Sequence, residues 1–394
     1  MLPARDILIE NGRVKQVGAH IAPPPGARIL DLSRYVVLPG LVEAHAHLLM
    51  EHPGDEGSGE TSVREVVREG DALRVLRGAA RAGTYLDAGF TTVRDLGNAG
   101  RFADVALRRA IAEGTIRGPR LFVAGPGLSP AGGQLDGVLE EHQNIVRHEY
   151  RIVRGADDAR AAVREIAVQG ADHVKLYSNA SPNPAYLSIE EMRAIVEEAN
   201  LMGLKVTAHA TNDRAINRAL DAGVRAIEHG RGATPATLAR MKQLGAVLVL
   251  TEAGRSLLAV DVARTPAERR PDRARIEAIL GLSRDRIEKA RDAGVEVAFG
   301  SDVYIDFGLP RGEAARMAIN AYVDGGASPA QALRSATWVA GNLVAPGELG
   351  TLREGAHADL IAVEGDPTIS LEALRNVRCI VLAGRTKDRL GSTC

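Results

Sequence analysis

The sequence predicts an α/β fold in which a (β/α)8 TIM barrel is joined to a small β-sandwich domain built from both chain ends. Three observations lead to this fold class. Strand patterns occur at both ends of the chain, eight short apolar runs alternate with helix-period segments between them, and many of these segments end at a glycine. Strands that alternate with helices indicate βαβ units and a parallel sheet. A doubly wound open sheet is the alternative, and eight strands with polar residues at their ends favour the barrel.

The two ends of the chain read as β structure. Near the amino terminus, Asp6–Glu10 and Arg13–Val17 flank Asn11-Gly12, a strong signal for a two-residue hairpin turn. Further strands are expected at Ala27–Leu32 and Tyr35–Leu38, and near the carboxyl terminus at Asp359–Val363 and Val377–Leu382. We therefore assign residues 1–38 and 345–394 to one composite β-sandwich domain.

Residues 39–344 carry the alternating pattern of the barrel. The expected strands are Leu41–His47, Thr91–Leu96, Arg120–Ala124, His173–Tyr177, Lys205–His209, Ala226–His229, Ala246–Thr251 and Glu296–Ser301. The expected helices are Thr61–Ala88, Phe102–Glu113, Asp157–Gln169, Ile189–Met202, Asp213–Ala222, Thr234–Leu244, Ile276–Ala293, Gly312–Asp324 and Pro329–Leu343. Ser188 with Glu191 three residues later predicts a capping box at the start of one of these helices.

The composition excludes several classes of protein. There are 49 Lys and Arg against 50 Asp and Glu, so the net charge of −1 gives no basic surface for nucleic acid or membrane. No stretch approaches the roughly 18 apolar residues of a spanning helix, and the charged amino terminus does not resemble a signal peptide. Two cysteines, Cys379 and Cys394, cannot form a disulfide framework. We expect a cytoplasmic enzyme with a small-molecule substrate. The composition does not decide whether the chain forms a homo-oligomer.

Polar side chains stand at the ends of five predicted strands. In parallel barrels the carboxyl ends of the strands build the active site, so these side chains are expected to converge there. Alternate residues of a strand face the same side, which lets both imidazoles of a His-x-His pair point at one place. Imidazole and carboxylate groups bind zinc and related metals. The sequence therefore predicts a metal site that includes His45, His47, Lys175, His209, His229 and Asp302.

The chain resembles the amidohydrolase superfamily of the binuclear metal type, in the branch of Xaa-Pro dipeptidases, imidazolonepropionase-related hydrolases and ochratoxin-type amidases. The matching stretches are VVLPGLVEAHAHL, AGFTTVRDLG, GPRLFVAG, GADHVKLY, VTAHA, AIEHG, FGSD and GAHADLIAVEGDP. The resemblance implies two divalent ions, usually zinc, one on His45, His47 and Asp302 and the other on His209 and His229. It also implies that Lys175 is carboxylated and bridges the two ions.

The resemblance further implies hydrolysis of an amide bond by a water shared between the ions, with Asp302 as general acid and base. The expected substrate is an N-acyl amino acid or an Xaa-Pro-type dipeptide. The alternatives are cyclic amides, lactones or carbamates, and a metal-binding scaffold without catalysis. The candidate substrate-binding residues are Tyr177, Gln134, Arg231, Arg255 and Tyr304. Gln134 stands where many relatives have histidine, and His52, in a long connection at the site face, is expected to be exposed.

Overall fold

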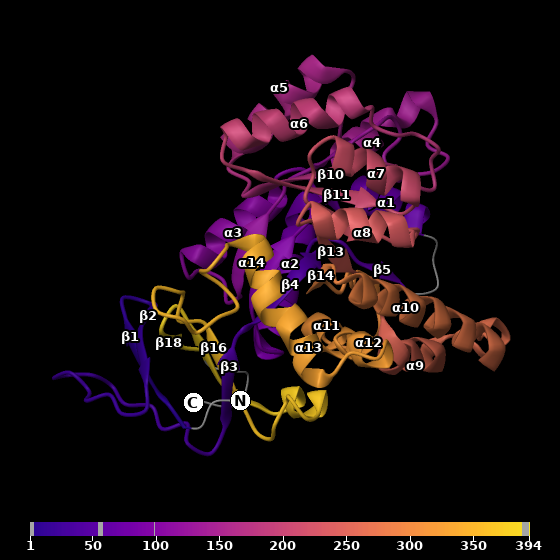
Figure 1. Cartoon of the computed structure of the whole chain (residues 1–394). Helices are drawn as coiled ribbons and strands as arrows, with labels where there is room; N and C mark the ends of the chain where they lie inside the picture. The colour runs from indigo at the N-terminus through magenta and orange to yellow at the C-terminus, as the bar shows by residue number, and fades with distance from the viewer. Residues whose placement is uncertain (1–3, 54–57, 98, 388–393) are drawn as a thin grey trace.

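The computed structural model describes residues 4–53, 58–97, 99–387 and 394. Figure 1 shows a barrel ringed by helices, with a small β region at one end where both termini lie. The arrangement confirms the predicted fold class. The boundaries of the two domains, 1–38 with 345–394 and 39–344, stay predictions.

The barrel consists of parallel strands in two sheets. One sheet has the order β4 (Leu41–Ala46), β6 (Phe90–Asp95) and β7 (Arg120–Val123). The other runs β14 (Glu296–Phe299), β13 (Val247–Leu250), β12 (Ala226–His229), β11 (Lys205–Ala210), β10 (His173–Tyr177), β8 (Gly127–Ser129) and β9 (Tyr150–Ile152). Two backbone hydrogen bonds join the sheets, from Asp172 to Val123 and from Asp302 to His45, each 2.8 Å long. The second bond closes the barrel beside the predicted metal site.

The helices that surround the barrel follow the predicted order with local differences. The segment expected as one helix over Thr61–Ala88 is divided at Gly70, whose φ of 69° ends the first helix. The predicted capping box at Ser188 and Glu191 is present. The helices are α1 (Ser58–Arg68), α2 (Gly70–Asp87), α3 (Ala103–Ala112), α4 (Gln143–Glu149), α5 (Ala156–Gln169), α6 (Ile189–Leu201), α7 (Asp213–Asp221), α8 (Pro235–Gln243), α9 (Gly254–Arg264), α10 (Arg273–Ala293), α11 (Arg311–Ala318), α12 (Asn320–Asp324), α13 (Pro329–Arg334) and α14 (Ala340–Val344), with a π-helical turn at Ser335–Val339.

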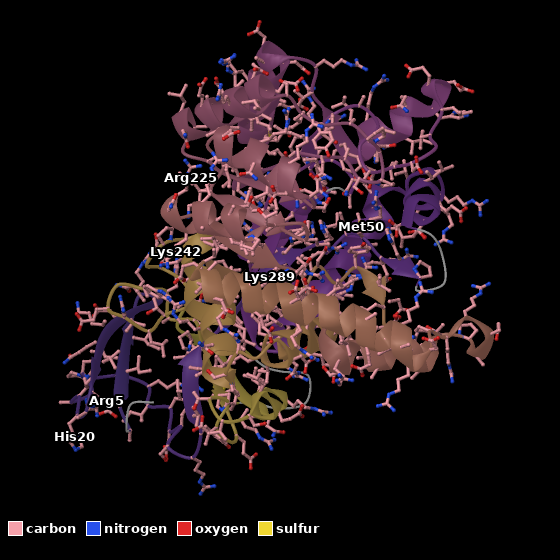
Figure 2. All side chains as sticks on the ribbon, turned by 45° about the vertical axis from the view of Figure 1, so that its right-hand side comes forward. Arg5, His20, Met50, Arg225, Lys242 and Lys289 are labelled. Atoms are coloured by element: carbon pink, nitrogen blue, oxygen red, sulfur yellow. A yellow bond between two sulfur atoms is a disulfide. The ribbon has the colours of Figure 1, made fainter. Side chains whose placement is uncertain are left out.

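The small β region is built from both chain ends. Its antiparallel sheet has the order β18 (Arg385–Thr386), β17 (Val377–Leu382), β16 (Leu360–Val363) and β3 (Val36–Pro39), and the hairpin of β1 (Asp6–Glu10) and β2 (Arg13–Gly18) lies beside it. The strand predicted at Ala27–Leu32 is wrong, because this segment pairs with no strand. Leu30 and Leu32 still pack into the apolar cluster of the region. Figure 2 shows Arg5 and His20 at its outer edge, far from Met50, which lines the cavity described below.

Two further observations concern the chain as a whole. Cys379 and Cys394 form a disulfide that ties the carboxyl terminus to β17, a single link that the sequence analysis did not anticipate. Within the described residues, no helix combines the length and the apolar character needed to span a bilayer.

Candidate active site at the carboxyl ends of the barrel strands

A cavity of about 230 Å³ lies at the carboxyl ends of the barrel strands. All six predicted metal ligands line it, namely His45, His47, Lys175, His209, His229 and Asp302. A second cavity of about 210 Å³ lies beside α2 and α11 and contains none of these six residues. The first cavity is therefore the place where the chain gathers its reactive side chains.

His45, His47 and Asp302 form a preassembled cluster. Their possible ligand atoms all lie within 4.8 Å of one another. Asp302 Oδ1 is 3.3 Å from His47 Nε2 and 3.5 Å from His45 Nε2. Both His45 Nε2 and Asp302 Oδ1 are buried and make no hydrogen bond within the described part of the chain. Buried polar atoms without partners are costly, so this pair of atoms fits a bound cation.

His209 and His229 stand on the other side of the cavity. Their ring centroids are 4.6 Å apart, and the His229 ring is 4.9 Å from that of His45. His229 Nδ1 lies 2.9 Å from the Thr251 hydroxyl, and His209 Nε2 lies 3.3 Å from the amide nitrogen of Gln134. These two histidines can complete a second cation site.

Two residues of the cluster have a backbone conformation that side chains rarely adopt. The φ angles of His229 and Asp302 are 68° and 51°. A left-handed conformation in a non-glycine residue costs free energy and is typical of functional sites. In both cases it comes at the end of a barrel strand and turns the side chain into the cavity. The strain is thus located at two predicted ligands.

Lys175 lies at the floor of the cavity and is buried. Its Nζ is 5.4 Å from the centroid of the Tyr177 ring. Among the described residues, no carboxylate oxygen lies within ion-pair distance of this amine, and burial lowers the pKa of Lys175 to about 8. A buried ammonium without a counterion is expensive, so the position favours a modified amine.

The electrostatics of the cluster suit a cation. Burial lowers the pKa of His45 to about 4, and it lowers the pKa of both His209 and His229 well below the usual value. These imidazoles are therefore neutral at pH 7 and can offer lone pairs. Burial alone would raise the pKa of Asp302, but His45 and His47 outweigh it and lower the pKa to about 2. The carboxylate is thus ionised, and the residues present fit a divalent metal.

Three buried carboxylates beneath the cluster were missed by the sequence analysis. Glu43 accepts hydrogen bonds from the backbone N–H of His45 and of Ser301, at 2.9 and 2.8 Å. Asp95 accepts from the N–H of Leu48 and of Gly97, at 2.7 and 2.8 Å. Glu228 contacts the His45 ring. Charged residues inside otherwise apolar strands were the available signal, and they connect the strands that carry the predicted ligands.

Four of the five candidate substrate residues line the cavity, and one does not. Tyr177, Gln134, Arg231 and Tyr304 surround its mouth and walls. The placement of Arg255 was wrong: this residue is exposed on α9, and its guanidinium pairs with Glu277 at 2.9 Å.

The expectation that His52 is exposed was also wrong. Its short strand β5 (His52–Pro53) pairs with β15 (Ile305–Asp306). The pairing buries the imidazole at the edge of the cavity.

The comparisons with known proteins point to one family. The sequence profile of the amidohydrolase family matches residues 36–387. Ochratoxinase of Aspergillus niger is 29% identical over 372 residues, covering 88% of this chain and 73% of that protein. A crystal structure of an amidohydrolase is 31% identical, with a TM-score of 0.80 over 97% of this chain and 93% of that one. A prolidase solved with N-methylphosphonate-L-proline is 29% identical, with a TM-score of 0.80 over 98% and 95%.

Proposed function

Because the chain belongs to the amidohydrolase family and is a hydrolase that acts on C–N bonds, we propose that its substrate is a small amide with a free carboxylate. The two substrate types that fit are an N-acyl amino acid and an Xaa-Pro-type dipeptide. Hydrolysis breaks the C–N bond and gives a carboxylic acid and an amine.

The cavity residues fit two divalent cations, which we take to be zinc. His45, His47 and Asp302 would hold one, His209 and His229 the other, and a carboxylated Lys175 would be shared between them. Such ions supply an activated water and a Lewis acid for the substrate carbonyl. Carboxylation would also replace the ammonium of Lys175 with an anionic group, and the two cations would then offset the cost of burying that charge.

Asp302 is placed to move the proton of the reaction. Its backbone N–H donates to the His45 carbonyl at 2.8 Å, and Oδ2 lies 3.8 Å from His229 Nδ1, so the carboxylate is fixed between both sides of the cavity. Because it is ionised at neutral pH, Asp302 can accept the proton of the attacking water. It can then deliver that proton to the leaving nitrogen.

The observation that carries the substrate class is the environment of Arg231. Its side chain lines the cavity, and within the described residues no acidic group pairs with its guanidinium. Its charge acts on His209 and His229 and also reaches the Tyr304 hydroxyl. A guanidinium binds a carboxylate through two parallel hydrogen bonds. An unpaired cation beside the reactive cluster therefore supports a substrate with a carboxylate.

The size of the cavity supports a small substrate. Its volume of about 230 Å³ is below the roughly 300–1,000 Å³ of sites for drug-sized ligands. The prolidase neighbour, which was solved with N-methylphosphonate-L-proline, supports the same class. A dipeptide-sized molecule matches both the cavity and the single guanidinium.

The test is hydrolysis by zinc-loaded protein of matched substrate pairs. Each N-acyl amino acid or Xaa-Pro dipeptide is paired with its carboxamide, and lactones and cyclic imides complete the panel. We expect turnover of the free acids and at least tenfold slower turnover of the carboxamides, since each loses a charge-assisted pair. Turnover of lactones or cyclic amides alone would overturn the proposed substrate class. Zinc binding without any turnover would favour a scaffold role.

A further inference from the structure

Glu228 is a buried carboxylate whose two oxygens are both engaged. It precedes His229 at the end of β12, and its side chain is 0% exposed. One oxygen lies 2.7 Å from His45 Nδ1, and the other accepts from Arg94 Nη2 at 2.6 Å and from the Thr207 hydroxyl. Its buried ion pair with the Arg94 guanidinium therefore holds the group as a fixed carboxylate.

This anion determines which nitrogen of His45 faces the cavity. A carboxylate that is paired with a guanidinium can only accept hydrogen bonds, so the proton of the 2.7 Å contact with Glu228 is on His45 Nδ1. The lone pair is then on Nε2, which is buried without a hydrogen-bond partner and lies 3.5 Å from Asp302 Oδ1. A carboxylate that accepts from a ligand histidine fixes its orientation and raises its basicity.

Arg94 in turn holds Glu228 in place. Its Nε donates to the Ala44 carbonyl at 2.7 Å, next to His45 on β4, while Nη2 donates to Glu228. The guanidinium is buried on β6. Strands from both sheets of the barrel are thereby locked around the His45 ring, because β4 and β6 of one sheet and β12 of the other each contribute to the network.

The other two histidines lack such support. His229 Nδ1 has the neutral hydroxyl of Thr251 as partner, and His209 Nε2 has the neutral amide of Gln134, which also donates to the Ser181 carbonyl at 3.1 Å. In the described part of the chain, no carboxylate lies within hydrogen-bond distance of either ring. The nearest one, Asp302 Oδ2, is 3.8 Å from His229 Nδ1.

We propose that Glu228 is a positioning residue that makes the His45–His47–Asp302 cluster the tighter of two cation sites, so that it fills first and empties last. The inference rests on the two-ion part of the proposed function and is independent of the substrate. Removal of a carboxylate that supports a ligand histidine weakens metal binding by roughly 10–100-fold. The loss of a neutral partner of His209 or His229 should leave the affinity of the tighter site for the cation unchanged.

The test is a zinc titration of the full-length protein after removal of metal, in competition with a chromophoric chelator. The wild-type protein should show a tight and a weaker step. Glu228→Gln should weaken the tight step about 10–100-fold, whereas the matched control Thr251→Val should change only the weaker step. An unchanged tight step in Glu228→Gln, or an equal loss in both steps, would overturn the proposal. Thermal unfolding of each metal-free variant shows whether the fold is intact.

A second measurement uses the wild-type chain and does not depend on a variant. Crystals grown with less than one equivalent of zinc should show anomalous scattering between His45, His47 and Asp302. Scattering that appears first between His209 and His229 would overturn the inference while leaving two-ion binding in place. Failure of zinc to bind anywhere would overturn both the inference and the two-ion part of the proposed function.

Discussion

The two sides of the cavity use the same kind of ligand in opposite surroundings. Behind His45 and His47 stand the buried charges of Glu228, Arg94 and Asp95. Behind His209 and His229 the partners are a hydroxyl and an amide, from Thr251 and Gln134. Buried charges that are fully paired fix geometry strongly, whereas neutral hydrogen bonds allow small movements. A rigid side and a more adaptable side therefore meet in one site.

The adaptable side also carries the residues that we propose to bind the substrate. Gln134 and Arg231 both line the cavity mouth, and Gln134 contacts His209 while Arg231 follows His229 by two residues. On the rigid side, the backbone of Asp302 is bound to that of His45. The carboxylate that we propose to transfer the proton is therefore held with the preassembled cluster, and the groups that we propose to recognise the substrate lie on the looser side.

The largest effect should come from Asp302, which contacts both sides. We expect Asp302→Asn to lower kcat by about 10²–10⁴-fold, because it removes the only proposed proton carrier and one ligand atom. The measurement is steady-state hydrolysis with zinc content determined on the same sample. Activity within tenfold of the wild type, with both ions retained, would exclude the acid–base role.

The second effect compares the buried charges with the neutral partners directly. Arg94→Met leaves the buried carboxylate of Glu228 without its cation, which should lower the free energy of unfolding by about 3–5 kcal/mol. Thr251→Val removes one hydrogen bond to His229, with an expected loss of about 1 kcal/mol. Urea unfolding of the two metal-free variants measures both values. Equal losses would mean that the two sides do not differ in rigidity.

The third effect concerns substrate recognition on the adaptable side. Arg231→Gln should raise KM for free-acid substrates about 10–100-fold, because a charge-assisted pair contributes about 1.5–3 kcal/mol, and should change kcat little. Arg255→Gln is the matched control and should leave both constants unchanged, since Arg255 pairs with Glu277 outside the cavity. A KM that is unaffected by Arg231→Gln would remove the carboxylate from the proposed substrate.

The predicted ligands could be found in the sequence because each lies in the carboxyl half of a short apolar strand or just after it, and strand ends converge in any parallel barrel. The network of Glu228 could not be found in this way. Its partners Arg94 and His45 lie 134 and 183 residues away, and only the closed barrel brings them together. Long-range partners leave no periodic signal in the chain, so a buried charge inside a strand was the only local clue.

The errors have equally local causes. Arg255 was placed at the site because it follows a barrel strand, but the first turn of α9 directs it to Glu277 on α10. His52 was expected to be exposed because it lies in a long connection, yet pairing with Ile305 buries it. A strand was expected at Ala27–Leu32, but the apolar side chains of this segment pack on one apolar cluster and its backbone pairs with no strand. In each case contacts with residues distant in the sequence determined the position of the segment, and the local sequence did not reveal them.

The smallest effect tests how far the charged support of the rigid side extends. Glu65 on α1 is buried beside Arg74, whose guanidinium makes a bidentate pair with Glu149 at 2.8 Å. Glu65 also accepts from the N–H of Glu51, in the connection that follows His47. Burial raises the pKa of Glu65 to about 7, although Arg74 opposes this. Glu65 thus links α1 to the segment that carries the preassembled ligands.

The raised pKa of Glu65 determines whether the free energy of unfolding rises or falls with pH. Between about pH 4.5 and pH 7 the folded chain keeps a proton that the unfolded chain has released, so stability falls as pH rises through this window. A glutamine at position 65 cannot titrate. The free energy of unfolding of Glu65→Gln should therefore rise relative to that of the wild type by about 2 kcal/mol from pH 5 to pH 7. Glu69→Gln, which removes an ion pair with Arg77, is the control and should run parallel to the wild type. If Glu65→Gln also ran parallel in urea unfolding, the buried charges would not extend their support beyond the barrel, and the rigidity of the first side would depend on Glu228 and its neighbours alone.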